Sequence, residues 1–259
     1  MPSMKGAFGS WDPHGWRWMF MLGGLPAILA LVIRLFIRES EVWEKTKARS
    51  WSHLGSGILS NWKLFAYIAV LMTAMNLSSH GTQDKYKALL AVSRGLDTHM
   101  ISWVIAFSMI GAILGGMVFG FLSDRLGRKR MMIAAFIGGL IALPFWAMSA
   151  HLPAIFASAF AMQFMVQGAW GIVPAHINEL SPDRVRGFLP GFAYQCGNLI
   201  SSPIPLLQAT LAQTIPYPTV MGLSVACIFV IAIFAVALGR ERRGVHFGSD
   251  ASAHSHPAR

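Results

Sequence analysis

Long apolar runs separated by short polar breaks dominate the hydrophobic pattern of this chain. A helix needs about 20 mostly apolar residues to cross the hydrocarbon core of a bilayer. Seven runs approach or exceed that length, at residues 16–37, 62–90, 98–122, 131–148, 153–177, 188–211 and 218–238. The pattern therefore predicts an all-α polytopic membrane protein with seven transmembrane helices. The polar, charge-mixed residues 38–61 separate the first run from a six-helix bundle at 62–238.

The basic residues indicate how these helices are oriented. With strict alternation of the loops, one side of the membrane receives all of the 21 lysines and arginines except Lys5, Arg17, Lys85, Lys87 and Arg94. Cytoplasmic loops carry the excess of positive charge, so we expect residues 1–15 to be extracytoplasmic and residues 38–61 to form a cytoplasmic linker. The polar residues 239–259 are predicted to be a disordered cytoplasmic tail. An outside N-terminus with an odd number of helices leads us to expect that a front half is missing.

Composition excludes most other classes of protein. The chain is 54% hydrophobic and only 12% charged, with mean hydropathy +0.52, whereas a soluble domain carries about 25% charged residues. Its net charge of +10 lies in loop clusters, so we expect a lipid bilayer and not nucleic acid as its partner. No phosphate loop, catalytic triad or metal-spaced set of ligands appears, and both cysteines lie in apolar runs. We therefore expect neither an enzyme nor a cofactor.

A polar stripe interrupts the second apolar run. Its members follow helical spacing of i, i+4, i+7, i+8 and i+11, which places them on one face of a single helix: Asn76, His80, Gln83, Asp84 and Lys87. Because ionisable groups are costly in lipid, this face should meet a cavity or a partner. A histidine four residues from a carboxylate can exchange a proton near neutral pH. The stripe indicates either a proton-coupled transport path or a structural polar network between helices.

A second polar cluster lies between the third and fourth runs and reads Gly-Phe-Leu-Ser-Asp-Arg-Leu-Gly-Arg-Lys-Arg. Its glycines allow a tight turn and its basic residues hold the loop inside; the residues that define it are Gly120, Asp124, Arg125, Gly127 and Arg128. The string resembles the loop signature G-x-x-x-D-R-x-G-R-[KR] of the major facilitator superfamily, which recurs there after helices two and eight. Present once, it implies that the seven runs correspond to helices six to twelve of that family.

The polar stripe also resembles a motif of one branch of that family. Residues 76–84 are similar to the helix-seven motif of the lactate/pyruvate–proton symporters of the sialate branch, although Lys87 and Ala88 stand where proline and threonine are usual. The resemblance implies transport of small monocarboxylates by proton symport with alternating access in the plasma membrane. It also implies a substrate and proton path formed by Asn76, His80, Gln83 and Asp84, with Gln195 facing it from helix eleven. An interhelical hydrogen bond is the alternative for Gln195.

Further charged residues lie at the predicted inner ends of the helices. Glu179 lies just beyond the fifth run, and Arg186 follows in a stretch that resembles the end of helix ten of the same branch. Together with the loop signature they are predicted to form an inner latch that pairs only while the cytoplasmic side is closed, or else simple helix caps. Glycines at 111, 115, 116 and 120 are predicted to bring a neighbouring backbone close.

Three functional hypotheses follow. In the first, the protein is a symporter whose partners are a monocarboxylate anion and a proton. In the second, the chain is an inactive fragment that requires a missing N-terminal half, because it lacks helices one to five and therefore half of the cavity. In the third, it is a seven-helix receptor or scaffold, against which the loop signature argues.

Overall fold

The computed structural model describes residues 15–36, 60–182 and 185–241, and the chain divides into two units, residues 1–47 and 48–259. The first unit contributes helix α1, Gly15–Phe36, which contains Pro26 and an apolar stretch at Phe20–Phe36. Residues 1–14 of the expected extracytoplasmic stretch 1–15 lie outside the described residues. The same holds for residues 38–59 of the expected linker 38–61 and for residues 242–259 of the expected tail 239–259.

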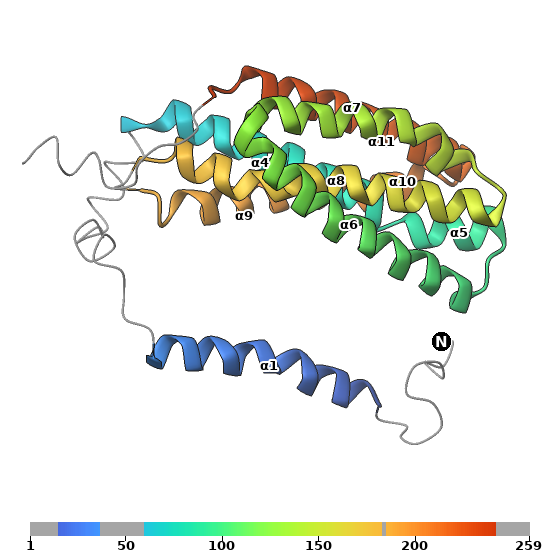
Figure 1. Ribbon diagram of the computed structural model, residues 1–259. Coiled ribbons are helices and arrows are strands. Elements are labelled where there is room, and N and C mark those ends of the chain that lie inside the picture. Colours follow the sequence, from blue (N-terminus) through green and yellow to red (C-terminus); the bar gives the residue numbers. More distant parts are fainter. Residues whose placement is uncertain (1–14, 37–59, 183–184, 242–259) are drawn as a thin grey trace, which may run out of the picture. The chain divides into compact units, whose positions relative to one another are not determined.

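The second unit is built from helices, and its described residues contain no strand. Its elements are α4 Trp62–Gln83, α5 Tyr86–Arg94, α6 Thr98–Leu126, α7 Arg128–Met148, α8 Leu152–Leu180, α9 Leu189–Ser201, α10 Ile204–Leu211 and α11 Tyr217–Leu238 (Figure 1). Of the helices described, α6, α7, α8 and α11 are long and apolar enough to cross a membrane. The prediction of an all-α membrane bundle is confirmed.

Two predicted spans are interrupted in the structure. The run 62–90 divides into α4 and α5 at Asp84 and Lys85, so the prediction that Lys87 shares one continuous helix with Asn76 is wrong. The run 188–211 divides into α9 and α10 at Ser202 and Pro203. Proline lacks a backbone N–H and restricts the residue before it, which explains the second break. At the first break no glycine or proline is present.

The loop signature is more helical than predicted. Helix α6 continues through Asp124 and Arg125 to Leu126, and α7 begins directly at Arg128. Only Gly127 lies between them, with φ of +105°. Glycine adopts such a conformation without steric cost. The tight turn is therefore a single residue.

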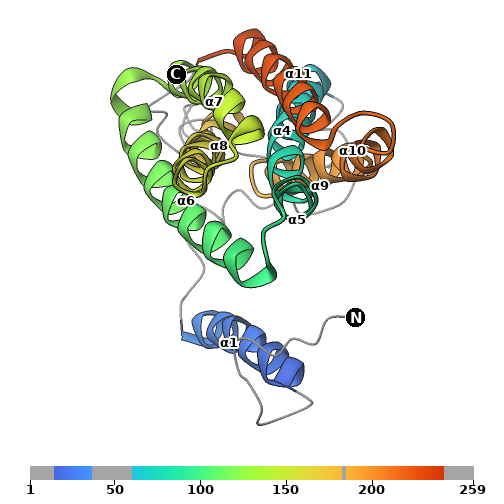
Figure 2. The same cartoon turned by 90° about the vertical axis from the view of Figure 1, so that its right-hand side faces the viewer.

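Helices in the second unit pack as α6 with α8, α8 with α7, α7 with α11, α11 with α4, and α4 with α9 (Figure 2). Between α6 and α8 the backbones touch, as the glycine spacing predicts. A Cβ atom added at Gly115 would lie 2.0 Å from the carbonyl oxygen of Phe164, and one added at Gly171 would lie 2.5 Å from that of Gly116. Such close approach is the usual consequence of small residues at a membrane helix interface.

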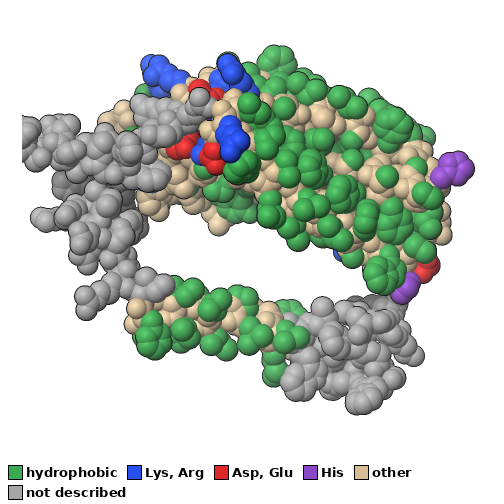
Figure 3. All heavy atoms as spheres, in the orientation of Figure 1, with side chains coloured by type: hydrophobic (Ala, Val, Ile, Leu, Met, Phe, Trp, Pro, Cys, Tyr) green, Lys and Arg blue, Asp and Glu red, His purple; other side chains and the backbone are tan. Residues whose placement is uncertain are grey.

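The surface separates apolar from charged side chains along the length of the bundle. Hydrophobic side chains cover most of the face in Figure 3, whereas most of the lysines and arginines in view gather at one end, and histidines and an acidic side chain lie at the other. We call the first of these the basic end; it holds Arg128, Lys129 and Arg130 at the start of α7. The break between α4 and α5 lies toward the opposite end (Figure 1). An apolar flank between polar ends is the surface that a bilayer requires.

Candidate functional site

The last turn of α4 brings His80 and Asp84 into direct contact. Nδ1 of the imidazole lies 2.9 Å from Oδ2 of the carboxylate, and the two side chains are 35% and 40% exposed. Residues four apart face each other along a helix, which is why the spacing alone places these groups together. At this distance a proton on Nδ1 is donated to the carboxylate in a hydrogen bond.

Asn76 lies elsewhere, in the contact between α4 and α9. Its side chain is 2% exposed, and its Nδ2 donates to the carbonyl oxygens of Met72 at 3.0 Å and Tyr194 at 3.4 Å. The amide also lies against Gly197, whose missing side chain makes room for it. In this structure Asn76 thus joins two helices, as intramembrane amides commonly do.

A cavity of about 470 Å³ opens beside Asp84 between four parts of the bundle. It is lined from the α4–α5 region and from α6, α7 and α8, by Thr82, Gln83, Asp84, Tyr86, Lys87, Ile105, Ser108, Met109, Trp146, Ala159 and Gln163. Its volume falls within the range of small-molecule sites, about 300–1,000 Å³. Of the residues predicted for the substrate path, Gln83 and Asp84 line this cavity.

Gln163 of α8 is a cavity residue that the sequence analysis missed. Its side chain is 5% exposed, and its Oε1 accepts a hydrogen bond of 3.2 Å from Nε2 of Gln83. The signal that could have identified it is the one used for Gln195, an amide within an apolar run. The bond links α8 to the end of α4 at the wall of the cavity.

Two aromatic rings form another part of the wall. Tyr86 and Trp146 stack with their ring centroids 4.7 Å apart, and both are buried. The hydroxyl of Tyr86 is buried without a hydrogen-bond partner among the described residues. Arg94, at the end of α5, donates from Nη2 to the carbonyl oxygen of Ala147 at 2.7 Å. These contacts hold α5 against the last turn of α7.

Gln195 does not line the cavity. It is exposed on α9, and its Oε1 accepts a long hydrogen bond of 3.5 Å from Nδ2 of Asn198. The structure therefore brings Gln83, His80 and Asp84 together and leaves Asn76 and Gln195 on the α4–α9 side of the bundle.

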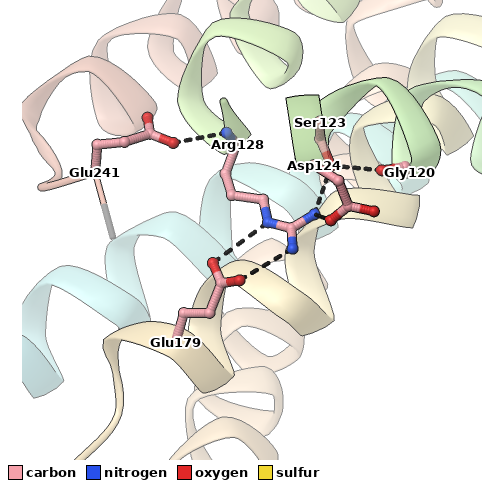
Figure 4. Close-up of polar contacts among 6 residues, drawn as sticks. All are labelled: Gly120, Ser123, Asp124, Arg128, Glu179 and Glu241. Atoms are coloured by element: carbon pink, nitrogen blue, oxygen red, sulfur yellow. Dashed lines mark hydrogen bonds and ion pairs between the residues drawn. The ribbon is translucent and has the colours of Figure 1, made fainter. Parts of the chain in front are cut away.

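At the basic end, Arg128 joins α6, α7 and α8 (Figure 4). Its Nε and Nη2 donate to the two oxygens of Glu179 at 3.3 and 3.0 Å. Its Nη1 lies 2.6 Å from Oδ1 of Asp124 and donates to Oγ of Ser123 at 2.7 Å. The Arg128 and Glu179 side chains are 11% and 9% exposed, whereas Asp124 is 60% exposed. The paired, two-pronged contact with Glu179 is therefore the buried one.

Glu241 adds a contact that the sequence analysis did not foresee, because this residue belongs to the predicted tail. Its two carboxylate oxygens accept the backbone N–H groups of Arg128 at 2.6 Å and Lys129 at 3.2 Å. In return, Nζ of Lys129 donates to the carbonyl oxygens of Ala237, at 2.9 Å, and Gly239. The start of α7 and the end of α11 thus satisfy each other's unpaired backbone groups.

The remaining residues of the predicted latch have local partners. The carbonyl oxygen of Gly120 accepts a hydrogen bond of 2.6 Å from Oγ of Ser123. The guanidinium of Arg125 lies over the ring of Phe121, 4.8 Å from its centroid. Arg186 donates from Nε to Asn178 O at 3.0 Å and from Nη2 to Ser181 O at 2.8 Å. It thereby caps the last carbonyl groups of α8.

Known proteins match both the sequence and the fold. The carboxylic acid transporter protein homolog of Saccharomyces cerevisiae is 28% identical over 274 residues, covering 91% of this chain and 44% of that protein. The sialic acid transporter NanX of Escherichia coli is 26% identical over 233 residues, covering 88% and 55%. A structure of the proton:xylose symporter XylE superposes with a TM-score of 0.52 at 18% identity, covering 71% of this chain and 44% of that one.

The chain spans about half the length of the curated relatives it matches. The likeness to XylE shows the fold alone. The major facilitator superfamily, to which the next comparison points, is a family of transporters and not of enzymes. The sequence model described as Major Facilitator Superfamily matches residues 85–257, which is more than half of the chain. In agreement with its loop signature, the chain therefore belongs to the major facilitator superfamily.

Proposed function

We propose that the protein moves small monocarboxylates of the lactate and pyruvate type together with a proton, and that the bundle of residues 60–241 forms the C-terminal half of the transport path. The observation that carries the proposal is the contact of 2.9 Å between His80 and Asp84, with Asp84 at the wall of the cavity. Relatives named as carboxylic acid and sialic acid transporters support an organic acid as substrate.

The charge of this pair explains how a proton and an anion are coupled. With a neutral imidazole the pair carries one negative charge, and protonation of His80 makes it neutral. Adding a carboxylate to the protonated pair restores one negative charge, so the loaded and empty carriers present the same charge to the membrane interior. Binding the anion without the proton adds a second negative charge, which is costly in a low-dielectric environment. Alternating access then favours the loaded and the empty forms.

The test is uptake of radiolabelled lactate into proteoliposomes containing the purified chain, driven by an imposed pH gradient. H80A and D84A should abolish uptake that a protonophore prevents. H99A is the matched control, because His99 is an exposed histidine at the start of α6 whose ring lies 6.1 Å from that of Trp103. Uptake by H80A or D84A that still follows the pH gradient would exclude this pair as the proton site.

A second candidate is a chain that transports only with a separate N-terminal half. The observation in its favour is that the chain spans 44% and 55% of the two curated relatives compared above. The same proteoliposomes separate the two candidates, since they contain no other protein. Uptake by the chain alone would reject the second candidate. Correct folding without uptake would reject transport by the chain alone.

We also propose that the basic end faces the cytoplasm of the plasma membrane, with the C-terminus inside. The clustering of Arg128, Lys129 and Arg130 at that end supports this orientation. Protease digestion of a C-terminal epitope in sealed right-side-out vesicles tests it. The epitope should survive until the vesicles are opened, and its removal from intact vesicles would reverse the assignment.

A further inference from the structure

The cavity beside Asp84 contains hydrogen-bond donors that the proton pair does not use. Among its described lining residues, Lys87 is the one permanent cation and Asp84 the one acid. Asp84 is already engaged by His80. Lys87 is exposed and lies on α5, beyond the break that ends the helix carrying His80.

The buried polar residues of the wall fall into two groups. The hydroxyls of Thr82 and Ser108 donate to backbone carbonyl oxygens of their own helices, at 2.7 Å in both cases. Gln163 uses its amide oxygen to accept from Gln83, which leaves its two amide N–H donors for the cavity. Tyr86 has a buried hydroxyl that makes no hydrogen bond with any described residue. Because that hydroxyl is also closed off from solvent, it does not offer a donor to a ligand in the cavity, and the amide of Gln163 does.

The charge balance of the cavity favours an anion when His80 is protonated. The imidazolium then offsets the carboxylate of Asp84, and Lys87 remains as an uncompensated positive charge. With a neutral imidazole, Lys87 and Asp84 offset each other. The attraction for an anion therefore appears on protonation, which is the order that the coupling requires.

We propose that this cavity is a carboxylate-binding subsite. Lys87 receives the carboxylate, the amide of Gln163 donates to a second oxygen of the same molecule, and Gln83 fixes the orientation of that amide. The apolar side chains of the wall, Ile105, Met109, Trp146 and Ala159, match a short hydrocarbon body. The ligand class is a small organic anion with one carboxylate. The inference rests on the proposed function and adds Lys87 and Gln163 to it.

Binding of radiolabelled lactate to the purified chain in lipid nanodiscs at pH 5.5 and 7.5 tests the subsite. We expect tighter binding at pH 5.5, and K87M and Q163L should each weaken it at least about tenfold, equal to about 1.4 kcal/mol. K85M and Q167L are matched controls, since Lys85 and Gln167 are neighbours of the same types that do not line the cavity. Lactamide, which lacks the charge, should compete poorly. Thermal unfolding of each variant confirms that it is folded.

The possible outcomes separate this inference from the function on which it rests. Lactate binding with the same affinity in K87M and Q163L as in the unchanged chain overturns the subsite and leaves monocarboxylate transport standing. A folded chain that binds no lactate at either pH overturns both. Equal losses in K85M and K87M, or in Q167L and Q163L, also overturn the subsite, because they indicate a general effect.

Chemical rescue gives a stricter test of Lys87. The chain has two cysteines, Cys196 and Cys227, and replacing both with serine leaves K87C as the one reactive thiol. Aminoethyl methanethiosulfonate then restores a lysine-like cation, whereas the hydroxyethyl reagent adds a neutral group of similar size. Recovery of lactate binding only with the cation supports the subsite. Equal recovery with the neutral reagent, or recovery with neither, rejects an electrostatic role for Lys87.

Discussion

The direct backbone contact between α6 and α8 makes one stability prediction quantitative. In G115A the new Cβ would lie 2.0 Å from the carbonyl oxygen of Phe164, whereas ordinary van der Waals contact begins at 3.4 Å. The obstacle is backbone, so no side chain can rotate away. The two helices must therefore separate by about 1.4 Å, which is the difference between these two distances.

Such a separation has a calculable effect. A gap of about 0.5–1 Å already removes a quarter to a half of the dispersion energy of each contact it opens. Overpacking in a dense interior costs about 1–3 kcal/mol, and occasionally more. The matched control is G116A, whose Cβ would meet its nearest atom at 3.6 Å. Both changes share the same gain in helix propensity, about 1 kcal/mol, so it cancels in the comparison. We expect G115A to be less stable than G116A by about 3 kcal/mol.

Reversible unfolding in mixed micelles, followed by tryptophan fluorescence, measures this difference as a free energy of unfolding. The same titration on the unchanged chain gives the reference. Equal unfolding free energies for G115A and G116A would refute the reasoning. That result would mean that the α6–α8 contact adjusts at no cost, or that the two backbones do not touch at this point.

Three further predictions concern the other helix contacts, each measured by the same unfolding titration unless stated. E179L leaves the buried Arg128 without its two-pronged partner and should lower the free energy of unfolding by about 3–5 kcal/mol. D124N changes a side chain that is 60% exposed and should lower it by less than about 1 kcal/mol. Equal losses in the two variants would contradict this prediction. E241A removes the acceptor of two α7 backbone N–H groups and should lower the free energy of unfolding by about 1 kcal/mol. Amide hydrogen exchange at Arg128 and Lys129 should become faster. Unchanged exchange at these two residues would reject the cap. G197A places a Cβ 2.6 Å from Nδ2 of Asn76 and should destabilise the chain by about 1–3 kcal/mol. G191A is the control, because a Cβ at that position has nothing within 4 Å and should not destabilise the chain. A G197A variant as stable as the unchanged chain would reject the tight α4–α9 contact.

Hydrophobic length predicts the helices well and their interruptions poorly. The runs at 98–122, 131–148, 153–177 and 218–238 correspond to single helices, because a continuous apolar stretch has no other way to satisfy its backbone in lipid. Pro203 was a visible signal for the break between α9 and α10. Asp84 and Lys85 gave no such signal, since both residues are compatible with a helix and both keep backbone angles in the right-handed helical region.

The candidate site follows the same division between local and distant information. Contact between His80 and Asp84 could be predicted, because two residues four apart in one helix meet whatever surrounds them. The partners of Gln83 and Asn76 could not, because each lies on a helix distant in sequence, at Gln163 and at Tyr194. Spacing assigned both amides to the same face, and the structure directs one to α8 and the other to α9.

The glycine contact between α6 and α8 also constrains one wall of the cavity. Ser108 and Gln163 lie on these two helices, whose backbones are already as close as atoms allow, so that wall has a fixed shape. Tyr86 and Lys87 lie on the nine-residue helix α5, which is joined to α4 by two residues. A change in the volume of the cavity therefore requires movement of the wall formed by α4, α5 and α7, because the α6–α8 wall cannot close further.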